Sequence, residues 1–136
     1  MGNLSLMPKI LALEEKMREF PQLDLPVKHY HIEGVYVREL FIPAGTVLTG
    51  KIHNKENISI LSQGELMISN GDSALRIIKA PYTVVDKPGV KRLGYAITDC
   101  TFINVLRSDK KTVPELEEEL VSDTFEQYEQ KRLGVL

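Results

Sequence analysis

The chain has 136 residues, of which 43% are hydrophobic and 26% are charged, so it has the size of one domain and is neither disordered nor fibrous. Its formal net charge of -2 creates no global field toward nucleic acid or an anionic membrane, and we expect neither as a partner. Cys100 is the only cysteine, which excludes an internal disulfide and a cysteine-rich zinc site and suits a reducing compartment.

Residues 1–33 are predicted to form an N-terminal helix and an extended arm. Pro8 suits the first turn of a helix over residues 8–20, along which apolar side chains recur at spacings of three and four. The start lacks the basic n-region of a signal peptide, and no apolar run reaches the roughly 20 residues that span a bilayer. We therefore expect a cytoplasmic protein. Pro21 and Pro26 favour an extended or turning connection after the helix.

Short β segments separated by turn signals occupy residues 34–108. The segments rich in β-forming residues are 35–42, 46–53, 58–61, 65–69, 73–78, 82–85, 91–98 and 100–107. Asn70-Gly71 tolerates the two positive φ angles of a type I′ turn, so a hairpin is predicted on either side of it. A series of roughly eight short strands predicts a mainly β, antiparallel sandwich or barrel, whose closure protects its edges.

Residues 109–136 are predicted to form an acidic C-terminal helix. Thr112 suits the N-cap, Pro114 suits the first turn, and Glu115 stands three residues after Thr112, as in a capping box. Apolar residues then recur at a spacing of four, while the acidic residues form a solvated face. The predicted organisation within one domain is helix, β-barrel, helix.

A frame of regularly spaced residues runs from Gly45 through Lys51, His53 and Asn57 to Gly64. It keeps every spacing of the first motif of the cupin family, G-x5-H-x-H-x3-E-x6-G, which this part of the chain resembles. The resemblance implies a cupin-type antiparallel β-barrel, or jelly roll, with an N-terminal and a C-terminal helix. Two of the motif's metal-ligand positions have changed identity, because Lys51 stands for a histidine and Asn57 for a glutamate.

A second segment, residues 82–96, resembles the second cupin motif, G-x5-P-x-G-x2-H-x3-N. Pro88 stands in the proline position, and Gly89 comes one residue early. Counting on from Gly89 places Arg92 in the histidine position and Ala96 in the asparagine position. The metal-ligand set that the resemblance implies is Lys51, His53, Asn57 and Arg92.

Residues 34–53 and 80–96, with the acidic closing helix, also resemble small cupin-like proteins of tailed bacteriophages, which have no assigned function. This resemblance implies a phage-encoded protein, found in the cytoplasm of the bacterial host or in the virion. It implies no activity.

The residues of the implied ligand set argue against a metal cofactor. A first-row metal usually takes about three neutral or anionic protein ligands, whereas Lys51 and Arg92 place two cations there. An arginine cannot be deprotonated in a protein, so no cofactor is expected. If the frame is relaxed, a divalent metal has other candidate ligands, since His-x-His puts two rings on one face of a strand. These candidates are His53, Glu56, His29 and His31.

The same residues can instead form a binding site for a small polar or anionic ligand. Lys51 and Arg92 would supply cationic donors, His53 and Asn57 orientable hydrogen bonds, and Tyr95 a further polar group. The competing interpretation is that the two cations only form ion pairs. The acidic partners considered for them are Glu39, Asp86 and Glu56.

Three functions follow, in order of expectation. The first is a non-catalytic, phage-encoded cupin-like barrel that binds a small ligand or serves in assembly. The second is a virion structural or decoration protein, with a filled barrel and apolar helix surfaces that contact other virion proteins. The third is a cupin enzyme with no metal or an atypical one, such as a sugar epimerase or isomerase. Its base would be His53, and its acid Tyr36, Tyr82 or Tyr95. Homo-oligomerisation fits all three functions.

Overall fold

The computed structural model describes residues 7–69 and 75–134. The helices are α1 (Met7–Met17), α2 (Val113–Leu120) and α3 (Phe125–Leu133). The strands are β1 (Val27–Ile32), β2 (Val35–Ile42), β3 (Val47–Thr49), β4 (Ile52–His53), β5 (Asn57–Gln63), β6 (Glu65–Ser69), β7 (Arg76–Lys79), β8 (Tyr82–Asp86), β9 (Leu93–Ala96), β10 (Cys100–Arg107) and β11 (Val121–Ser122). None of the helices in the described ranges is long and apolar enough to cross a membrane.

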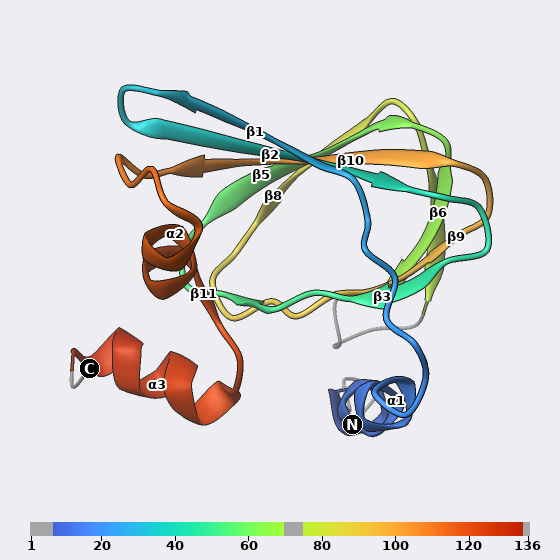
Figure 1. Ribbon diagram of the computed structural model, residues 1–136, viewed down its shortest axis with the longest axis horizontal. Coiled ribbons are helices and arrows are strands. Elements are labelled where there is room, and N and C mark those ends of the chain that lie inside the picture. Colours follow the sequence, from blue (N-terminus) through green and yellow to red (C-terminus); the bar gives the residue numbers. More distant parts are fainter. Residues whose placement is uncertain (1–6, 70–74, 135–136) are drawn as a thin grey trace.

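Two antiparallel sheets face each other and enclose the barrel interior (Figure 1). One sheet has the strand order β1-β2-β10-β5-β8, and the other has the order β3-β9-β6-β7. A short pair, β11-β4, lies beside the mouth of the barrel. This architecture confirms the predicted mainly β, cupin-type barrel, because alternate residues of each strand face inward and build one core.

Strand β1 lies within the segment that was expected to be an extended arm. Its six residues pair with β2 along their whole length, so that His29 lies opposite Arg38. Pro21 and Pro26, which predicted an extended or turning connection, both precede β1. They therefore remove no backbone N–H group from the hydrogen bonds between β1 and β2. The first sheet therefore begins at Val27, inside the predicted arm.

The predicted hairpin is present as a pair of antiparallel strands. Leu66 of β6 lies opposite Ile78 of β7, and Ile68 lies opposite Arg76. The Asn70-Gly71 turn itself lies outside the described residues. The predicted strand over residues 46–53 is divided into β3 and β4, because the chain turns away from β9 after Thr49.

The acidic C-terminal segment forms two helices, where a single helix was expected. Thr112 caps α2 as predicted, its hydroxyl accepting a hydrogen bond from the backbone N–H of Glu115. The helix then stops at Leu120, since the next two residues extend to pair with β4. Thr124 caps α3 in the same way, its hydroxyl accepting from the Gln127 N–H at 3.0 Å. This second N-cap was not recognised in the sequence.

Two hydrophobic clusters hold these parts together. The larger one fills the closed end of the barrel between the two sheets. The smaller one consists of Tyr36, Leu106, Leu116 and Leu120, and it fixes α2 across the other end. Backbone hydrogen bonding strengthens that attachment, because the Asn54 N–H donates to the Leu120 carbonyl at 2.8 Å. Helix α2 thereby becomes a wall of the barrel interior.

The two glycines of the frame adopt the backbone conformation that the motif requires. Gly45 has φ of 85° and Gly64 has φ of 94°, a region that side chains disfavour. The surroundings of the two differ. A Cβ atom on Gly64 would lie 2.2 Å from the Asp99 carbonyl oxygen, whereas a Cβ atom on Gly45 would meet nothing within 4 Å.

We predict that Gly64→Ala destabilises the protein more than Gly45→Ala does. At Gly45 only the positive φ opposes alanine, at about 1 to 2 kcal/mol. At Gly64 the clash with the Asp99 carbonyl adds overpacking of about 1 to 3 kcal/mol. Urea unfolding of both variants and of the wild type measures the difference. Equal losses in the two variants would contradict this account.

Candidate functional site

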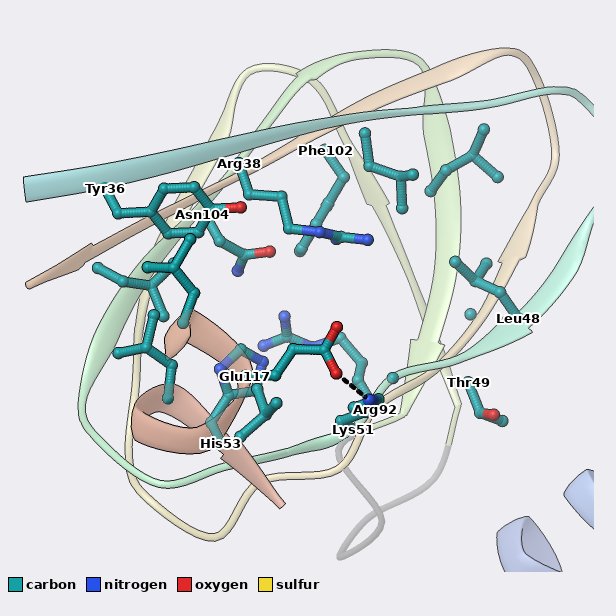
Figure 2. Close-up of a pocket in the computed structure, with 18 of the residues that line it drawn as sticks. Tyr36, Arg38, Leu48, Thr49, Lys51, His53, Arg92, Phe102, Asn104 and Glu117 are labelled. Carbon is teal, nitrogen blue, oxygen red and sulfur yellow. Dashed lines mark hydrogen bonds and ion pairs between the residues drawn. The ribbon is translucent and has the colours of Figure 1, made fainter. Parts of the chain in front are cut away.

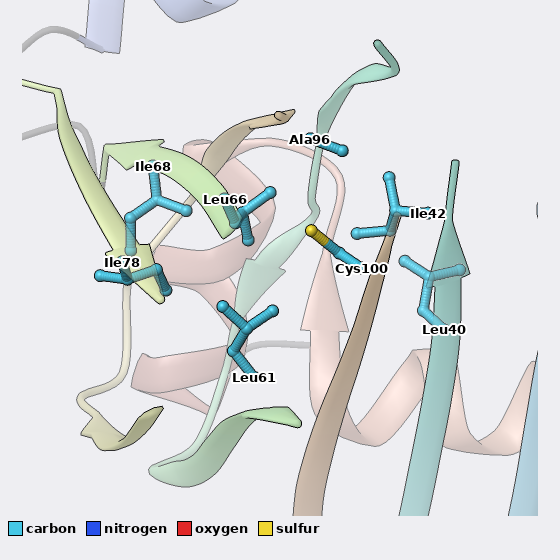
Figure 3. Packing of buried hydrophobic residues seen from close by; sticks show 8 residues of the cluster. All are labelled: Leu40, Ile42, Leu61, Leu66, Ile68, Ile78, Ala96 and Cys100. Atoms are coloured by element: carbon cyan, nitrogen blue, oxygen red, sulfur yellow. The ribbon is translucent and has the colours of Figure 1, made fainter. Parts of the chain in front are cut away.

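The barrel contains a cavity of about 390 Å³ that opens beside α2 (Figure 2). One part of its wall is apolar and continues into the larger hydrophobic cluster (Figure 3). The residues of this apolar wall are Leu40, Ile42, Leu48, Leu66, Ile68 and Phe102. The other part is polar and faces α2. The interior is therefore hollow, and its lining has a distinct apolar end and a distinct polar end.

At the mouth of the cavity, Lys51 is held by acidic side chains from the C-terminal segment. Its Nζ atom lies 2.8 Å from Glu117 Oε2 and 3.2 Å from Asp123 Oδ1. The hydrogen bond with Glu117 raises the pKa of Lys51, so the side chain stays charged. Lys51 does not contact Glu39, Asp86 or Glu56, which were the partners considered from sequence.

Arg92 is neutralised deeper in the barrel by Asp86, as one interpretation of the sequence anticipated. The two side chains form an ion pair and are only 13% and 3% exposed. The Arg92 guanidinium also lies over the Phe102 ring, with Cζ 5.4 Å from the ring centroid. Asp86 thus balances the formal charge of Arg92, although the guanidinium still contributes to the lowered pKa of the nearby His53.

A chain of hydrogen bonds connects this ion pair to His53. Ser59 donates to Asp86 and accepts from Arg92 Nη1 at 3.2 Å and from Asn104 Nδ2 at 2.8 Å. Asn104 also approaches Asn57 Oδ1 at 3.4 Å. The Asn57 amide then donates to His53 Nδ1 at 3.1 Å. Three of the four positions in the implied ligand set thus belong to one network.

His53 is a neutral hydrogen-bond donor in this setting. Burial, together with the positive charges of Arg92 and Arg38, lowers its pKa from 6.5 to about 4. Because Nδ1 accepts from the Asn57 amide, the ring hydrogen of the neutral form is on Nε2. His53 lines the cavity, so it offers an N–H group and no charge at neutral pH.

Arg38 is the cation that sequence reasoning missed. It projects from β2 into the cavity and lies between His29 of β1 and Asn104 of β10 in the sheet register (Figure 2). Among the described residues, its guanidinium has neither a hydrogen-bond partner nor a carboxylate within ion-pair distance. Its positive charge still acts on its neighbours, since it contributes to the lowered pKa of His53 and opposes part of the rise that burial causes in the pKa of Tyr36. Arg38 thus supplies the uncompensated charge of the lining.

Tyr36 lies on the same strand, one inward-facing position from Arg38. Its hydroxyl group is 2.6 Å from His29 Nδ1, and the His31 ring packs 5.2 Å from the Tyr36 ring. Burial raises the pKa of Tyr36, so the phenol keeps its proton at neutral pH. His29 and His31 share one face of β1, as their spacing predicts. His29 lines the cavity beside Tyr36, whereas His31 is not among its lining residues.

The remaining candidate residues lie away from this group. Tyr95 is 41% exposed, because on β9 it is the neighbouring Gly94 that faces the cavity. Tyr82 packs against the larger hydrophobic cluster, and its hydroxyl accepts from Arg76 at 3.3 Å. Glu56 is an exposed loop residue. Of the three tyrosines considered as an acid, only Tyr36 lines the cavity.

The residues at the metal-ligand positions do not form a donor set for a cation. Lys51 and Arg92 are positively charged, and the Asn57 amide oxygen and nitrogen are both used within the network. Only His53 could offer a neutral nitrogen, and a single ligand does not hold a first-row metal. Within the described ranges, no three His, Cys, Asp or Glu side chains come together as a metal-binding group.

Ser59, Asn104 and Glu117 also belong to the site and were not identified from sequence. The alternation of inward and outward side chains along a strand offered a signal for Ser59 and Asn104. Both are polar residues at inward-facing positions, where apolar residues are the usual choice. The same rule applies to Arg38 on β2. Glu117 carried no such signal, since it is one of several acidic residues on its helix.

The low pKa of His53 predicts a specific pH dependence of stability. The unfolded chain takes up a proton near pH 6.5 and the folded chain only near pH 4. The corresponding stability, about 3 kcal/mol at about 1.4 kcal/mol per pH unit, is present above pH 6.5 and lost as the pH falls toward 4. Urea unfolding of the wild type and of His53→Gln between pH 4 and 7.5 measures the difference. Parallel pH curves for the two proteins would contradict it.

Comparisons with known proteins agree with the architecture. No protein-family model and no curated protein matches the chain. Among solved structures, an RmlC-like cupin family protein from Methanocaldococcus jannaschii superposes with a TM-score of 0.54 and 21% identity, over 63% of this chain and 82% of that one. A cupin superfamily protein from Desulfitobacterium hafniense gives 0.54 and 9%, over 66% and 83%.

Some structures with this fold are enzymes. The DMSP lyase DddQ from Ruegeria pomeroyi superposes with a TM-score of 0.55 and 14% identity, over 65% of this chain and 49% of that one. At such identities the similarity concerns the path of the backbone and transfers no activity. Together with the topology and the frame glycines, these structures show that the chain has the cupin fold.

Proposed function

We propose that the barrel binds a small organic anion with an apolar body, and that it does so without a metal ion. The observation that carries this proposal is Arg38, a partly buried guanidinium in a hollow barrel, with no hydrogen-bonding or ion-pairing partner among the described residues. A charge removed from water without a partner is costly, and a bound anion removes that cost. The proposal moves the anion-binding role from Lys51 and Arg92 to Arg38.

The charges around the cavity favour one anionic group at this position. Asp86 pairs with Arg92 and Glu117 pairs with Lys51, while Asp123, a second partner of Lys51, is exposed and does not line the cavity. Arg38 is therefore the lining cation that has no carboxylate partner among the described residues. A guanidinium presents two parallel N–H groups that match the two oxygens of a carboxylate. The Nε2–H group of His53 and the Tyr36 hydroxyl line the same space and can bind a second polar atom of the ligand.

The rest of the cavity suits an apolar ligand body. Side chains such as Leu48, Ile68 and Phe102 cover the end away from α2 and offer no hydrogen bond. A volume of about 390 Å³ falls within the range of small-molecule sites, about 300 to 1,000 Å³. A short aliphatic or aromatic carboxylate meets both requirements, with its charge on Arg38 and its hydrocarbon against the apolar wall.

We further propose that the protein is phage-encoded and forms a homo-oligomer in the cytoplasm of the bacterial host. The resemblance of residues 34–53 to phage cupin-like proteins supports the origin. A role as a virion building block is the alternative. The hollow interior supports ligand binding over that role, because a purely structural block has no use for an uncompensated charge inside it.

A metal-free enzyme is a second candidate, favoured by the contact between the Tyr36 hydroxyl and His29 at the cavity wall. A phenol that keeps its proton can act as an acid toward a bound carbonyl oxygen. His53 lines the same cavity and would accept a proton through Nε2 only in its other neutral tautomer, with the hydrogen on Nδ1 and the hydrogen bond from the Asn57 amide broken. Proton transfer at a carbon beside the ligand's carbonyl group is the reaction that this arrangement would support.

The binding proposal predicts that carboxylates bind more tightly than their neutral amides. Hexanoate and benzoate should exceed hexanamide and benzamide by about 10- to 100-fold, the effect of a charge-assisted hydrogen bond worth about 1.5 to 3 kcal/mol. Arg38→Gln should remove this preference while leaving the amides unaffected. Isothermal titration calorimetry measures both. Equal binding of acid and amide by the wild type would contradict the proposal.

The two candidate functions predict different behaviour with 2-oxobutyrate in D₂O. A pure binding protein should leave the exchange of its C3 protons at the buffer rate, which is the result we expect. An enzyme should accelerate that exchange, and Tyr36→Phe should abolish the acceleration while retaining binding. Proton NMR follows the C3 signal directly. Faster exchange that depends on Tyr36 would replace the first proposal with the second.

A further inference from the structure

The outer face of the five-stranded sheet carries an unbroken row of apolar side chains. Cross-strand register places Tyr30 beside Val37, Val37 beside Val105, Val105 beside Ile58, and Ile58 beside Val85. The row crosses β1, β2, β10, β5 and β8 without a polar residue. Tyr30, Ile58 and Val85 are 48%, 39% and 57% exposed, so their side chains lie in solvent.

This face differs from the usual pattern of an antiparallel sheet, which is apolar toward the core and polar toward water. Adjacent positions are mixed. Ile32 is 71% exposed at one corner and Ile103 lies beside Ile60 in the next row, but Lys28 and Glu39 of that row form an ion pair. The three helices of the described chain lie on the opposite side of the molecule (Figure 1). No described element therefore covers the row.

We infer that this face binds a second copy of the same chain, sheet against sheet, around a two-fold axis that runs along β10. Val105 is the central position of the row, so a two-fold axis there lets the apolar row face itself. Val105 on the axis meets Val105 of the second copy. Val37 on one side meets Ile58, and Tyr30 meets Val85, so that every apolar side chain of the row covers another one.

The size and charge of the face fit this occupant. Five strands about 4.8 Å apart, with lengths of 5 to 8 residues at about 3.4 Å each, give a flat footprint of roughly 550 Å² before side-chain relief is counted. A standard interface buries about 800 Å² per partner. Homodimer interfaces are more apolar than transient ones, as this row is. A formal net charge of only -2 adds little repulsion between two copies.

The inference is independent of the proposed ligand. The row faces away from the cavity, since the inward residues of the same strands, Arg38 of β2 and Asn104 of β10, line it. The surface lies on the sheet and far from α3, which buries none of its residues against the barrel.

Sedimentation velocity at micromolar concentration tests the interface, with a wild-type dimer of twice 15.4 kDa as the expected result. Tyr30→Glu alone and Val85→Lys alone should each raise the dissociation constant at least about 10-fold, because each buries a charge against apolar surface. The two positions lie on opposite edges of one sheet and meet only across the axis. The double variant should therefore associate at least about 10-fold more tightly than either single variant.

Ile77→Lys is the matched control, because Ile77 is 53% exposed but lies on the other sheet. It should leave the dimer unchanged. Thermal unfolding by circular dichroism verifies that each variant folds, and Ile58→Lys replaces any variant that does not. A monomeric wild type overturns the inference, and so does a dimer that Ile77→Lys disrupts equally. Failure of the double variant to recover overturns the two-fold arrangement.

Discussion

The ion pair between Asp86 and Arg92 connects the end of β8 in one sheet to the residue that precedes β9 in the other, and the polar interior is organised around it. Arg92 occupies a position where the cupin frame places a metal ligand, and Asp86 supplies the negative charge that makes a buried guanidinium tolerable there. Ser59 and Asn104 complete the hydrogen bonds of the pair. Removing Asp86 would leave a buried charge unpaired, so the two residues depend on each other.

The positions of the other polar residues in the network depend on this ion pair. Asn104 orients Asn57, and the Asn57 amide determines which nitrogen of His53 carries hydrogen. The positive charge retained at Arg92 also helps to keep His53 neutral, because its Coulombic effect lowers the histidine pKa. The barrel thus has the positive-φ glycines of the cupin frame, while the positions that the resemblance assigns to metal ligands hold a network of directed hydrogen bonds.

Local signals in the sequence were sufficient for most of the fold. The strand series, the β6–β7 hairpin and the Thr112 cap depend on residues close together in the chain, and each was found in the structure. Strand β1 and the break between α2 and α3 were missed, because both result from pairing with distant segments. The ion-pair partners in the site follow the same rule, because the one that is near in sequence was predicted and the distant one was not. Asp86 lies six residues from its partner and was anticipated, whereas Glu117 lies 66 residues from Lys51 and was not.

Helix α2 has a double role that links ligand capture to the order of the C-terminal segment. Leu116 and Leu120 pack against Tyr36 and Leu106 of the sheet, and the same helix closes the cavity. A molecule inside the barrel would touch α2 and the strands together, and so add to the contacts that keep the helix docked. By mass action, filling the cavity then protects this segment against local opening. Resistance to proteolysis near residue 120 would thus report whether the barrel is occupied.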